Sequence, residues 1–183
     1  MRRVVATELV SMDGVVESPD EWAFSYTDEE MAAEDAAGMA ASDALLLGRV
    51  TYEEFASFWP DQPRGTPMVD YINDVQKFVV SGTLEGPLGW NNSTLVEGGL
   101  AEGIAELKRR PGKDIVITGS GTLVRALMRE GLLDELRYLV HPVVRGSGKR
   151  LFEGEDDRRE LELVDSKTYG TGVVALTYRP AGA

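Results

Sequence analysis

Residues 114–131 have the sequence DIVITGSGTLVRALMREG, and this stretch decides the fold class. The β-branched run from Asp114 to Thr118 predicts a buried strand. Gly119-Ser120-Gly121-Thr122 then predicts a tight turn, because glycine permits backbone conformations that other residues avoid. The helix expected after the turn ends at Gly131 and carries on one face the apolar residues Leu123, Val124, Leu127 and Met128. A strand, a turn and a helix in this order indicate an α/β protein.

The chain before this unit shows the same alternation of strands and helices. Apolar runs predict strands at Val4–Val10, Ala44–Gly48, Lys77–Ser81 and Thr94–Val96. Helix starts are expected at two capping boxes, Thr27 with Glu30 and Thr51 with Glu54, and at Pro67. A further helix is expected from Leu100 to Arg110, because Pro111-Gly112 stops it.

The chain after Asp134 changes to strands alone. Strands are expected over Leu136–Val144, Leu161–Lys167 and Val173–Tyr178, the last two forming a hairpin around Gly170-Thr171-Gly172. No long linker and no internal repeat interrupts the sequence. We therefore predict one domain, residues 1–183, built on a mixed sheet of about eight strands covered by helices.

Composition excludes several classes of function. The 183 residues include 19 Lys and Arg against 31 Asp and Glu, so the net charge is −12 and a nucleic-acid backbone would be repelled. The absence of Cys and the single His exclude disulfide scaffolds, thiol catalysis and multi-His zinc sites. The acidic run at 153–157 favours a solvated loop over a metal site. No apolar run approaches the ~18 residues of a membrane span, and no targeting segment is convincing, so a cytoplasmic protein is expected.

Two strand-to-helix turns are suited to binding an anion. Gly48-Arg49-Val50-Thr51 and Gly119–Thr122 each place backbone N–H groups at the start of a helix, where the helix dipole attracts negative charge. Arg49 adds a guanidinium that can pair with a phosphate. The pair of turns suggests a cofactor that contains a diphosphate. The dinucleotide fingerprint GxGxxG is incomplete, however, because Val124 stands at its third glycine.

Four segments together resemble the dihydrofolate reductase-like superfamily, and more closely the reductase domain of bacterial riboflavin biosynthesis and its stand-alone relatives. They occur in the family's order and span nearly the whole chain. The four segments are Ser11-Met12-Asp13-Gly14, residues 45–53 (LLLGRVTYE), residues 117–136 (ITGSGTLVRALMREGLLDEL) and residues 142–152 (PVVRGSGKRLF).

The resemblance implies a mixed, mainly parallel eight-stranded sheet flanked by helices, with NADPH as the cofactor. It implies contacts to the phosphates, to the adenine ribose with its 2′-phosphate, and to the nicotinamide. The residues matched to the cofactor are Thr7, Gly14, Gly48, Arg49, Val50, Thr51, Ser81, Thr83, Gly119, Ser120, Gly121, Thr122 and Leu123. Arg49 is placed to hold the extra phosphate of NADP, and Lys77 or Arg2 is expected to assist. The family commonly forms homodimers, so a homodimer is expected.

The expected chemistry is hydride transfer to a small heterocyclic or unsaturated substrate. Asp13 is the polar candidate for catalysis near the nicotinamide, against the alternative that it only forms a turn. The aromatic residues Trp22, Tyr52 and Phe55 are candidates for the substrate cavity or for the core. His141, in a strand before Pro142, is expected to be structural.

The loop from Ser11 to Tyr26 bears on the substrate, because it is acidic and aromatic and has no Lys or Arg. Its charge argues against a phosphorylated substrate, and hence against the riboflavin-pathway step. The zinc deaminase that often accompanies the riboflavin reductase is excluded, since Cys and the His-x-Glu motif are missing. Three alternatives stay open: 5-amino-6-(5-phosphoribosylamino)uracil reductase, dihydrofolate reductase, and a non-catalytic NADP-binding module.

Overall fold

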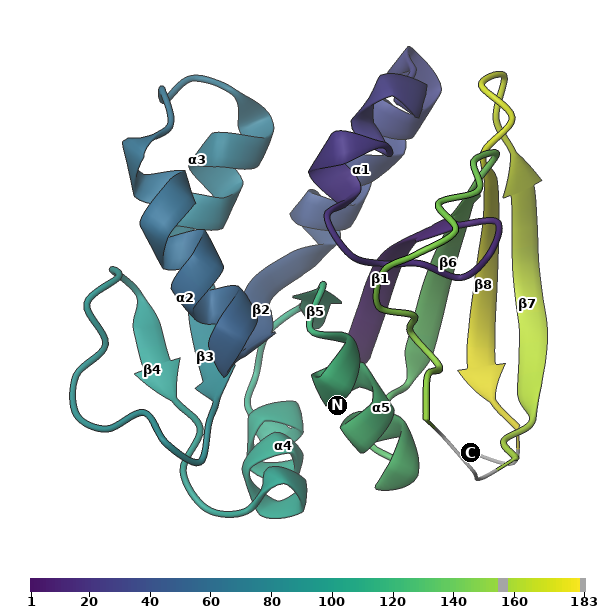
Figure 1. Cartoon of the computed structure of the whole chain (residues 1–183). Helices are drawn as coiled ribbons and strands as arrows, with labels where there is room; N and C mark the ends of the chain where they lie inside the picture. The colour runs from purple at the N-terminus through teal and green to yellow at the C-terminus, as the bar shows by residue number, and fades with distance from the viewer. Residues whose placement is uncertain (155–157, 182–183) are drawn as a thin grey trace.

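A computed structural model describes residues 1–154 and 158–181, which form an eight-stranded sheet flanked by helices (Figure 1). The strand order is β4-β3-β2-β5-β1-β6-β8-β7. All neighbours from β4 to β6 run parallel, and β8 pairs antiparallel with β6 and β7. The prediction of a mixed, mainly parallel sheet is confirmed.

The strands and helices follow the expected order. The strands are β1 (Val4–Ser11), β2 (Ser42–Gly48), β3 (Gln76–Val80), β4 (Ser93–Leu95), β5 (Asp114–Thr118), β6 (Glu135–His141), β7 (Leu161–Thr168) and β8 (Val174–Pro180). The α-helices are α1 (Glu29–Ala41), α2 (Arg49–Phe58), α3 (Pro67–Asp74), α4 (Leu100–Arg109) and α5 (Gly121–Arg129). Short 3-10 turns, which the sequence did not predict, occur at Pro19–Glu21, Phe24–Tyr26 and Trp59–Asp61.

The core has two sides because side chains of a strand alternate between the faces of the sheet. On one face Ala44 and Leu46 of β2 pack in a cluster with residues of α4 and α5. On the other face Leu45 and Leu47 pack in a cluster with residues of α2 and α3. Figure 1 shows α4 and α5 grouped on one side of the sheet, and α2 and α3 grouped apart from them. The central strands are therefore buried on both faces, as parallel strands usually are.

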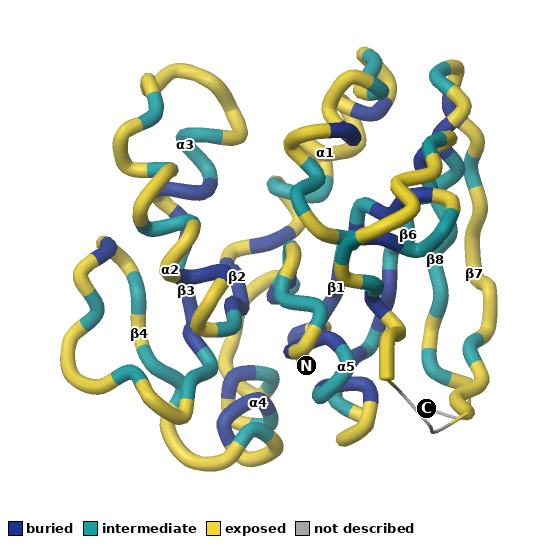
Figure 2. Tube along the Cα trace, viewed as in Figure 1, coloured by how far each residue is buried: buried dark blue, intermediate teal, exposed yellow. Residues whose placement is uncertain are grey.

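Helix α1 covers its part of the sheet loosely. Met31 is buried against Leu139 and Tyr169, whereas most of the helix is exposed (Figure 2). The alanine-rich sequence explains this, because alanine favours a helix without supplying much apolar surface to bury. The sheet beneath α1 is consequently left accessible, and this opening becomes part of the cavity described below.

Both predicted capping boxes are wrong. Helix α1 begins at Glu29, with Asp28 as N-cap, and the Asp28 carboxylate accepts the N–H of Met31 at 2.9 Å. Helix α2 begins at Arg49, two residues before Thr51, and its N-cap Gly48 has no side chain to cap it. The Thr51 hydroxyl instead accepts a hydrogen bond from the hydroxyl of Ser120, in the turn before α5. Contacts between residues far apart in the sequence, rather than the local capping motif, determine where α2 begins.

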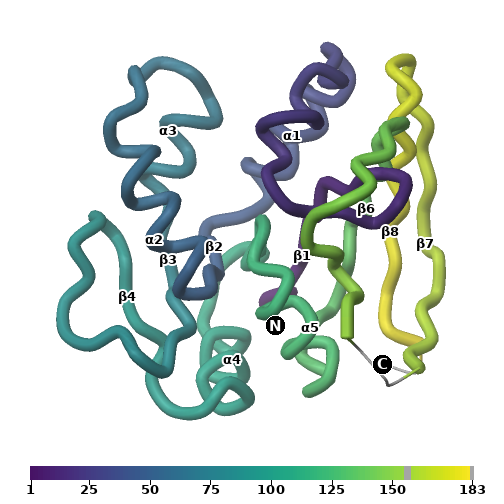
Figure 3. Tube along the Cα trace, in the orientation of Figure 1, coloured from purple at the N-terminus to yellow at the C-terminus, as the bar shows by residue number. Residues whose placement is uncertain are grey.

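The loop after β1 is fastened to the segment after β6. In Figure 3 the purple loop that follows β1 runs beside the green segment that follows β6. Backbone hydrogen bonds join Met12 N to Val143 O at 2.8 Å and Val16 N to Lys149 O at 2.9 Å. The two segments together close the carboxyl end of β1, which is where a ligand of an open α/β sheet is expected.

Candidate functional site

The first turns of α2 and α5 meet at the carboxyl ends of the neighbouring strands β2 and β5. Ser120 joins them, because its Oγ accepts the N–H of Gly48 at 3.0 Å and donates to Thr51 Oγ1 at 2.6 Å. A Cβ added at Gly48 would lie 3.3 Å from Ser120 Oγ, so the close approach favours glycine there. The two turns that the sequence singled out therefore form one site.

Both helices begin without a side-chain cap. Neither Gly48 nor Ser120 caps its helix, so first-turn N–H groups of α2 and α5 have no helical carbonyl to bond. The backbone of the second turn is also unusual, since Gly119 has φ 67° and Ser120 has φ 62°. A serine held in the left-handed region is strained, and such strain concentrates at functional sites. Two sets of such N–H groups at one place are suited to binding an anion.

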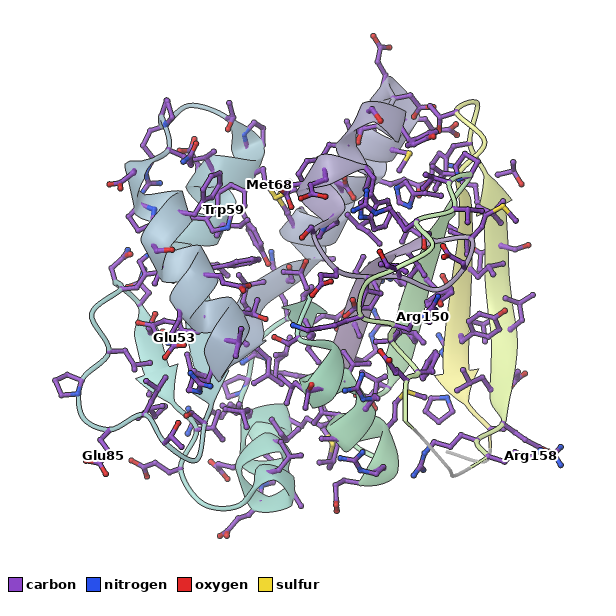
Figure 4. The ribbon with its side chains drawn as sticks, viewed as in Figure 1. Glu53, Trp59, Met68, Glu85, Arg150 and Arg158 are labelled. Carbon is purple, nitrogen blue, oxygen red and sulfur yellow. The ribbon has the colours of Figure 1, made fainter. Side chains whose placement is uncertain are left out.

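A large cavity, of about 1960 Å³, opens at these turns and extends over the sheet beneath α1. Most of the residues expected at the site line this cavity. The predicted residues that line it are Thr7, Gly48, Arg49, Val50, Thr51, Phe55, Gly119, Ser120, Gly121, Thr122 and Leu123. On the opposite wall, Met68 extends from α3 toward α1, near Trp59 (Figure 4). The cavity is large enough for a dinucleotide and a small second molecule.

Arg49 is the cation of the first turn. Its NH1 is 2.8 Å from Glu53 Oε2, one helical turn later, and its side chain remains 44% exposed. An exposed pair of this kind contributes little stability, so a phosphate can compete for the guanidinium. By contrast, Arg2 is buried against Asp43 and the backbone of Lys113, away from the cavity. The expectation that Arg2 assists at the phosphate is therefore wrong.

Lys77 is also unavailable to a phosphate, which corrects the second expectation for an assisting cation. Its side chain is fully buried, and Nζ donates to the carbonyls of Asn73 at 3.0 Å and Val75 at 2.9 Å. Nζ also lies 4.3 Å from the centre of the Trp90 ring. Burial lowers the pKa of Lys77 to about 8. This lysine joins the end of α3 to the start of β3.

Ser81 and Thr83 follow β3 but do not line the cavity, although the preceding Val80 does. Ser81 Oγ accepts the N–H of Thr83 at 3.1 Å and that of Leu84 at 2.9 Å, which closes a turn. Their contact with an adenine ribose stays a prediction.

Two of the three aromatic candidates belong to the core. Tyr52 is buried, and its hydroxyl accepts the N–H of Trp90 at 3.2 Å. Trp22 is buried and packs edge-on against His141, with ring centres 5.4 Å apart. Neither lines the large cavity, whereas Phe55 does, and a contact of these aromatic residues with the substrate stays a prediction. His141 itself lines the cavity, and burial lowers its pKa.

Asp13 has a different task from the one expected. Its carboxylate accepts the N–H groups of Arg145 at 3.0 Å and Gly146 at 2.8 Å, and the Ser11 hydroxyl at 2.7 Å. These bonds hold the pKa of Asp13 well below its usual range. Asp13 does not line the cavity and forms the turn that the sequence offered as the alternative, so its part in catalysis stays a prediction. Asp13, with Gly14 beside it at φ 87°, forms the turn that anchors segment 142–150.

Two other acidic side chains of the loop, Glu17 and Glu21, form ion pairs with that same segment. Glu17 pairs with Lys149 at 3.4 Å, and Glu21 pairs with Arg145 at 2.9 Å. Arg150, which Figure 4 shows on the segment in front of β6, lies 3.7 Å from Asp13 Oδ2. The argument from sequence against a phosphorylated substrate therefore fails, because it counted the loop without the cations that pair with it.

Sequence reasoning missed two acidic residues that line the cavity. Glu8, on β1, is 3% exposed, and burial raises its pKa to about 8. Asp35, on α1, has its pKa raised by burial and then by the charge of Glu34. Glu8 could have been noticed from the sequence, because it lies within a predicted strand of apolar residues. An ionisable side chain is rarely buried in such a strand without a partner.

The described residues contain neither a membrane-spanning helix nor a cluster of metal-binding side chains. No helix among them is long and apolar enough to cross a membrane. No group of three or more acidic or histidine side chains among them is arranged to hold a metal ion. In the acidic run expected to be a solvated loop, Glu155, Asp156 and Asp157 lie outside the described residues.

Known proteins match the chain over nearly its full length. Two Bacillus subtilis proteins, YyaP and YwjB, are respectively 29% identical over 181 residues and 30% identical over 179 residues. Those alignments cover 97% and 94% of this chain, and 94% and 95% of the relatives.

Solved structures show the same fold. A structure from Shewanella sp. PV-4, assigned to riboflavin biosynthesis, has a TM-score of 0.77 at 23% identity and covers 97% of this chain and 98% of its own. The deaminase/5-amino-6-(5-phosphoribosylamino)uracil reductase of Thermotoga maritima has a TM-score of 0.69 at 13% identity, over 98% of this chain and 57% of its own.

The profile of the RibD C-terminal domain matches residues 2–175, which is most of the chain. The fold of these neighbours also fits the dihydrofolate reductase-like superfamily that the sequence resembles. The chain therefore belongs to the RibD C-terminal domain family.

Proposed function

We propose that this chain is an NADPH-dependent reductase that transfers a hydride to a small heterocyclic or unsaturated substrate. The observation that carries the proposal is the junction of two uncapped helix starts, α2 and α5, on one large cavity. Family membership and the reductase neighbours support an oxidoreductase.

The residues at the junction fit a dinucleotide. Free first-turn N–H groups of α2 and α5 suit the two phosphates of its diphosphate. The close approach at Gly48 and the left-handed Gly119 leave backbone rather than side chain facing the ligand. Arg49 would hold the 2′-phosphate, and Thr7, in the middle of β1, lies beside Thr118 at the end of β5, where the nicotinamide is expected. When bound, the cofactor supplies the hydride.

The protein's own contribution is orientation and exclusion of water. The cavity continues from the turns over the sheet beneath α1, so a substrate there would lie beside the cofactor. Holding two reactants at the attack geometry removes an entropic cost of several kcal/mol from the barrier. The fastened loop over β1 shields this end of the cavity from water, which strengthens electrostatic interactions inside it.

Replacing Arg49 tests the cofactor assignment. We expect Arg49→Ala to weaken NADPH binding roughly ten- to a hundredfold, since a charge-assisted hydrogen bond contributes about 1.5–3 kcal/mol. NADH lacks the 2′-phosphate and should lose little. Titration calorimetry with both cofactors measures this, and Arg64→Ala is the matched control, because Arg64 pairs with Asp70 and Asp74 outside the cavity. Equal losses for NADPH and NADH would refute the 2′-phosphate role.

A second candidate is 5-amino-6-(5-phosphoribosylamino)uracil reductase. It is supported by the family and by the pairing of the loop carboxylates with Lys149 and Arg145, which removes the charge objection. NADPH oxidation with that substrate as acceptor tests it, and turnover only with unphosphorylated acceptors would exclude it. Binding of NADPH without oxidation by any acceptor would favour a non-catalytic module.

We also propose a homodimer. Strand β7 lies at the edge of the sheet, and Leu163 and Val164 on it are 50% and 38% exposed. An exposed apolar edge strand is a ready partner for another chain. Light scattering during size-exclusion chromatography should give twice the mass of 20.0 kDa, and a monomer at micromolar concentration would contradict the proposal.

A further inference from the structure

Arg137 is a cation on β6, in the floor that the sheet forms for the cavity. In the sheet it is paired with Thr7 of β1, where the proposed function places the nicotinamide. Alternate residues of a strand share a face of the sheet, and Leu139, two residues after Arg137, packs against Met31 of α1. The Arg137 side chain therefore points into the space beneath α1. It lines the cavity and is 35% exposed, so a ligand can reach it.

One edge of the Arg137 guanidinium is engaged and the other is open. Nε and Nη2 lie 3.0 and 2.9 Å from Oε1 of Glu135. Nη1 has no hydrogen-bond acceptor among the described residues, although the group carries two N–H donors. An ion pair that used the whole guanidinium would explain Arg137 as a structural residue, but this pair leaves half of its donors facing the cavity.

Helix α1 leaves the space above Nη1 uncovered. Gly38 of α1 lies over it, since a Cβ added at Gly38 would be 3.8 Å from Nη1 and would meet no other side-chain atom of the described residues within 4 Å. Glycine is unfavourable inside a helix, so a glycine here calls for a reason, and a larger side chain would cover Nη1. The gap between helix and guanidinium is one atom thick, which suits a flat group better than a tetrahedral phosphate.

Glu135 does not balance the charge of Arg137 alone. Its carboxylate is also 3.1 Å from Nη1 of Arg3 and 3.6 Å from Nη2 of Arg179. Arg3 has a second partner, Asp114. Three guanidinium groups thus share two carboxylates, which leaves one positive charge in excess on this part of the sheet. A local excess of positive charge attracts an anion, and one excess charge matches a monoanion.

The charges that face Arg137 from above belong to α1. Glu34 lines the cavity and is engaged with Lys167 of β7, which also pairs with Glu30 at 2.8 Å. Asp35 lines the cavity without an ion-pair partner among the described residues. Asp35 is therefore the group that opposes an anion at Arg137, and removing its charge should strengthen the binding of an anion there.

We propose that Arg137 binds a carboxylate group of the substrate through Nη1, so that the substrate is a small unsaturated or heterocyclic carboxylic acid. A hydrogen bond between a guanidinium and a carboxylate is charge-assisted and strong, and it fixes the direction of the bound acid. Because Arg137 is the neighbour of Thr7, the body of the acid would lie beside the nicotinamide. This inference rests on the proposed function and names the substrate class of the same site.

Pairs of probes that differ in one group test the proposal. Orotate and 6-methyluracil share a pyrimidine ring, and pterin-6-carboxylate and 6-methylpterin share a pterin ring; in each pair a methyl group replaces the carboxylate. They are titrated by calorimetry into the protein saturated with NADP⁺, which prevents turnover. In at least one pair we expect the acid to bind about ten- to a hundredfold more tightly than its methyl analogue.

Three variants identify the residue responsible. Arg137→Gln should abolish the preference for the acid, whereas Arg137→Lys keeps a cation and should retain part of it. Asp35→Asn should tighten the acid severalfold and leave the methyl analogue unchanged, a gain that partial unfolding cannot produce. Arg64→Gln is the matched control, because Arg64 pairs with Asp70 and Asp74 outside the cavity, and it should leave both probes unchanged.

The outcomes separate this inference from the proposed function. Equal binding of acid and methyl analogue in both pairs, or a preference that survives Arg137→Gln, would overturn the inference. Tighter binding of inorganic phosphate than of acetate, lost in Arg137→Gln, would replace the carboxylate with a phosphate and also overturn it. Failure of the wild type to bind NADP⁺ and NADPH would instead overturn the proposed function, and the probe pairs titrated without cofactor would still decide whether Arg137 binds a carboxylate.

Discussion

Replacing Glu8 with glutamine should stabilise the protein above neutral pH. Burial raises the pKa of Glu8 from 4.5 to about 8 in the folded state, a difference of about 3.5 pH units. At 1.36 kcal/mol for each unit, this corresponds to roughly 5 kcal/mol. The folded chain binds more protons than the unfolded chain between these two pKa values, so the free energy of unfolding falls as pH rises from 4.5 to 8. Above pH 8 both states are ionised and the loss is complete.

Urea unfolding of both proteins at pH 5 and at pH 8.5 measures this effect. We expect the gain in unfolding free energy of Glu8→Gln over the wild type to be several kcal/mol larger at pH 8.5 than at pH 5. The other carboxylates titrate in both proteins, so their contributions cancel in the difference. Glu85→Gln, in the exposed loop after β3 (Figure 4), controls for the change of side chain alone. An equal difference at the two pH values would show that Glu8 is already ionised in the folded protein at pH 5, and would refute the reasoning.

Two further predictions concern residues that proved structural. Burial lowers the pKa of Lys77 from 10.5 to about 8 in the folded state. Between these two pH values the unfolded chain binds more protons than the folded chain. The free energy of unfolding of the wild type should therefore rise with pH over this range, by roughly 3 kcal/mol. Lys77→Met should lack this rise in urea unfolding at pH 8 and pH 10.5; a parallel rise would contradict it. Asp13→Asn weakens the bonds to Arg145 and Gly146, so amide hydrogen exchange at these residues should accelerate, and unchanged exchange would show that the anchor is not needed. The lowered pKa of Asp13 stabilises the protein above its unfolded value of 3.8, so this variant should lose more stability at pH 7 than at pH 2.

The order of strands and helices was predictable because it depends on local patterns. The apolar run at Asp114–Thr118 and the turn at Gly119–Thr122 were enough to predict β5 and α5. Pro67 correctly marked the start of α3, and Pro111 correctly marked the end of α4. The start of α2 was not predictable in this way. Ser120 is 72 residues away from Gly48 in the sequence, yet its hydroxyl is hydrogen-bonded to Gly48 and to Thr51. A local sequence motif contains no information on such distant contacts.

The candidate site was predictable where backbone geometry defines it and not where side chains meet from distant segments. The two turns were predictable from their glycines and from Arg49, although the first residue of α2 was not. The roles of Asp13 and Lys77 depend on residues that come close to them only in the folded chain. Asp13 contacts Arg145, and Lys77 contacts Trp90. Glu8 looked like an interruption of a strand, because the sequence does not show that both of its neighbouring strands bury it.

Hydrogen–deuterium exchange with and without NADPH tests most directly whether the paired helix starts bind the cofactor. We expect NADPH to slow exchange at the first-turn amides of α2 (49–51) and of α5 (121–122), because their free N–H groups become bonded to phosphates. Amides of α4 at 101–102, whose helix also starts without a side-chain cap but lies outside the junction, should be unaffected. Binding of NADPH that leaves 49–51 and 121–122 unprotected would place the cofactor elsewhere and contradict the proposed site.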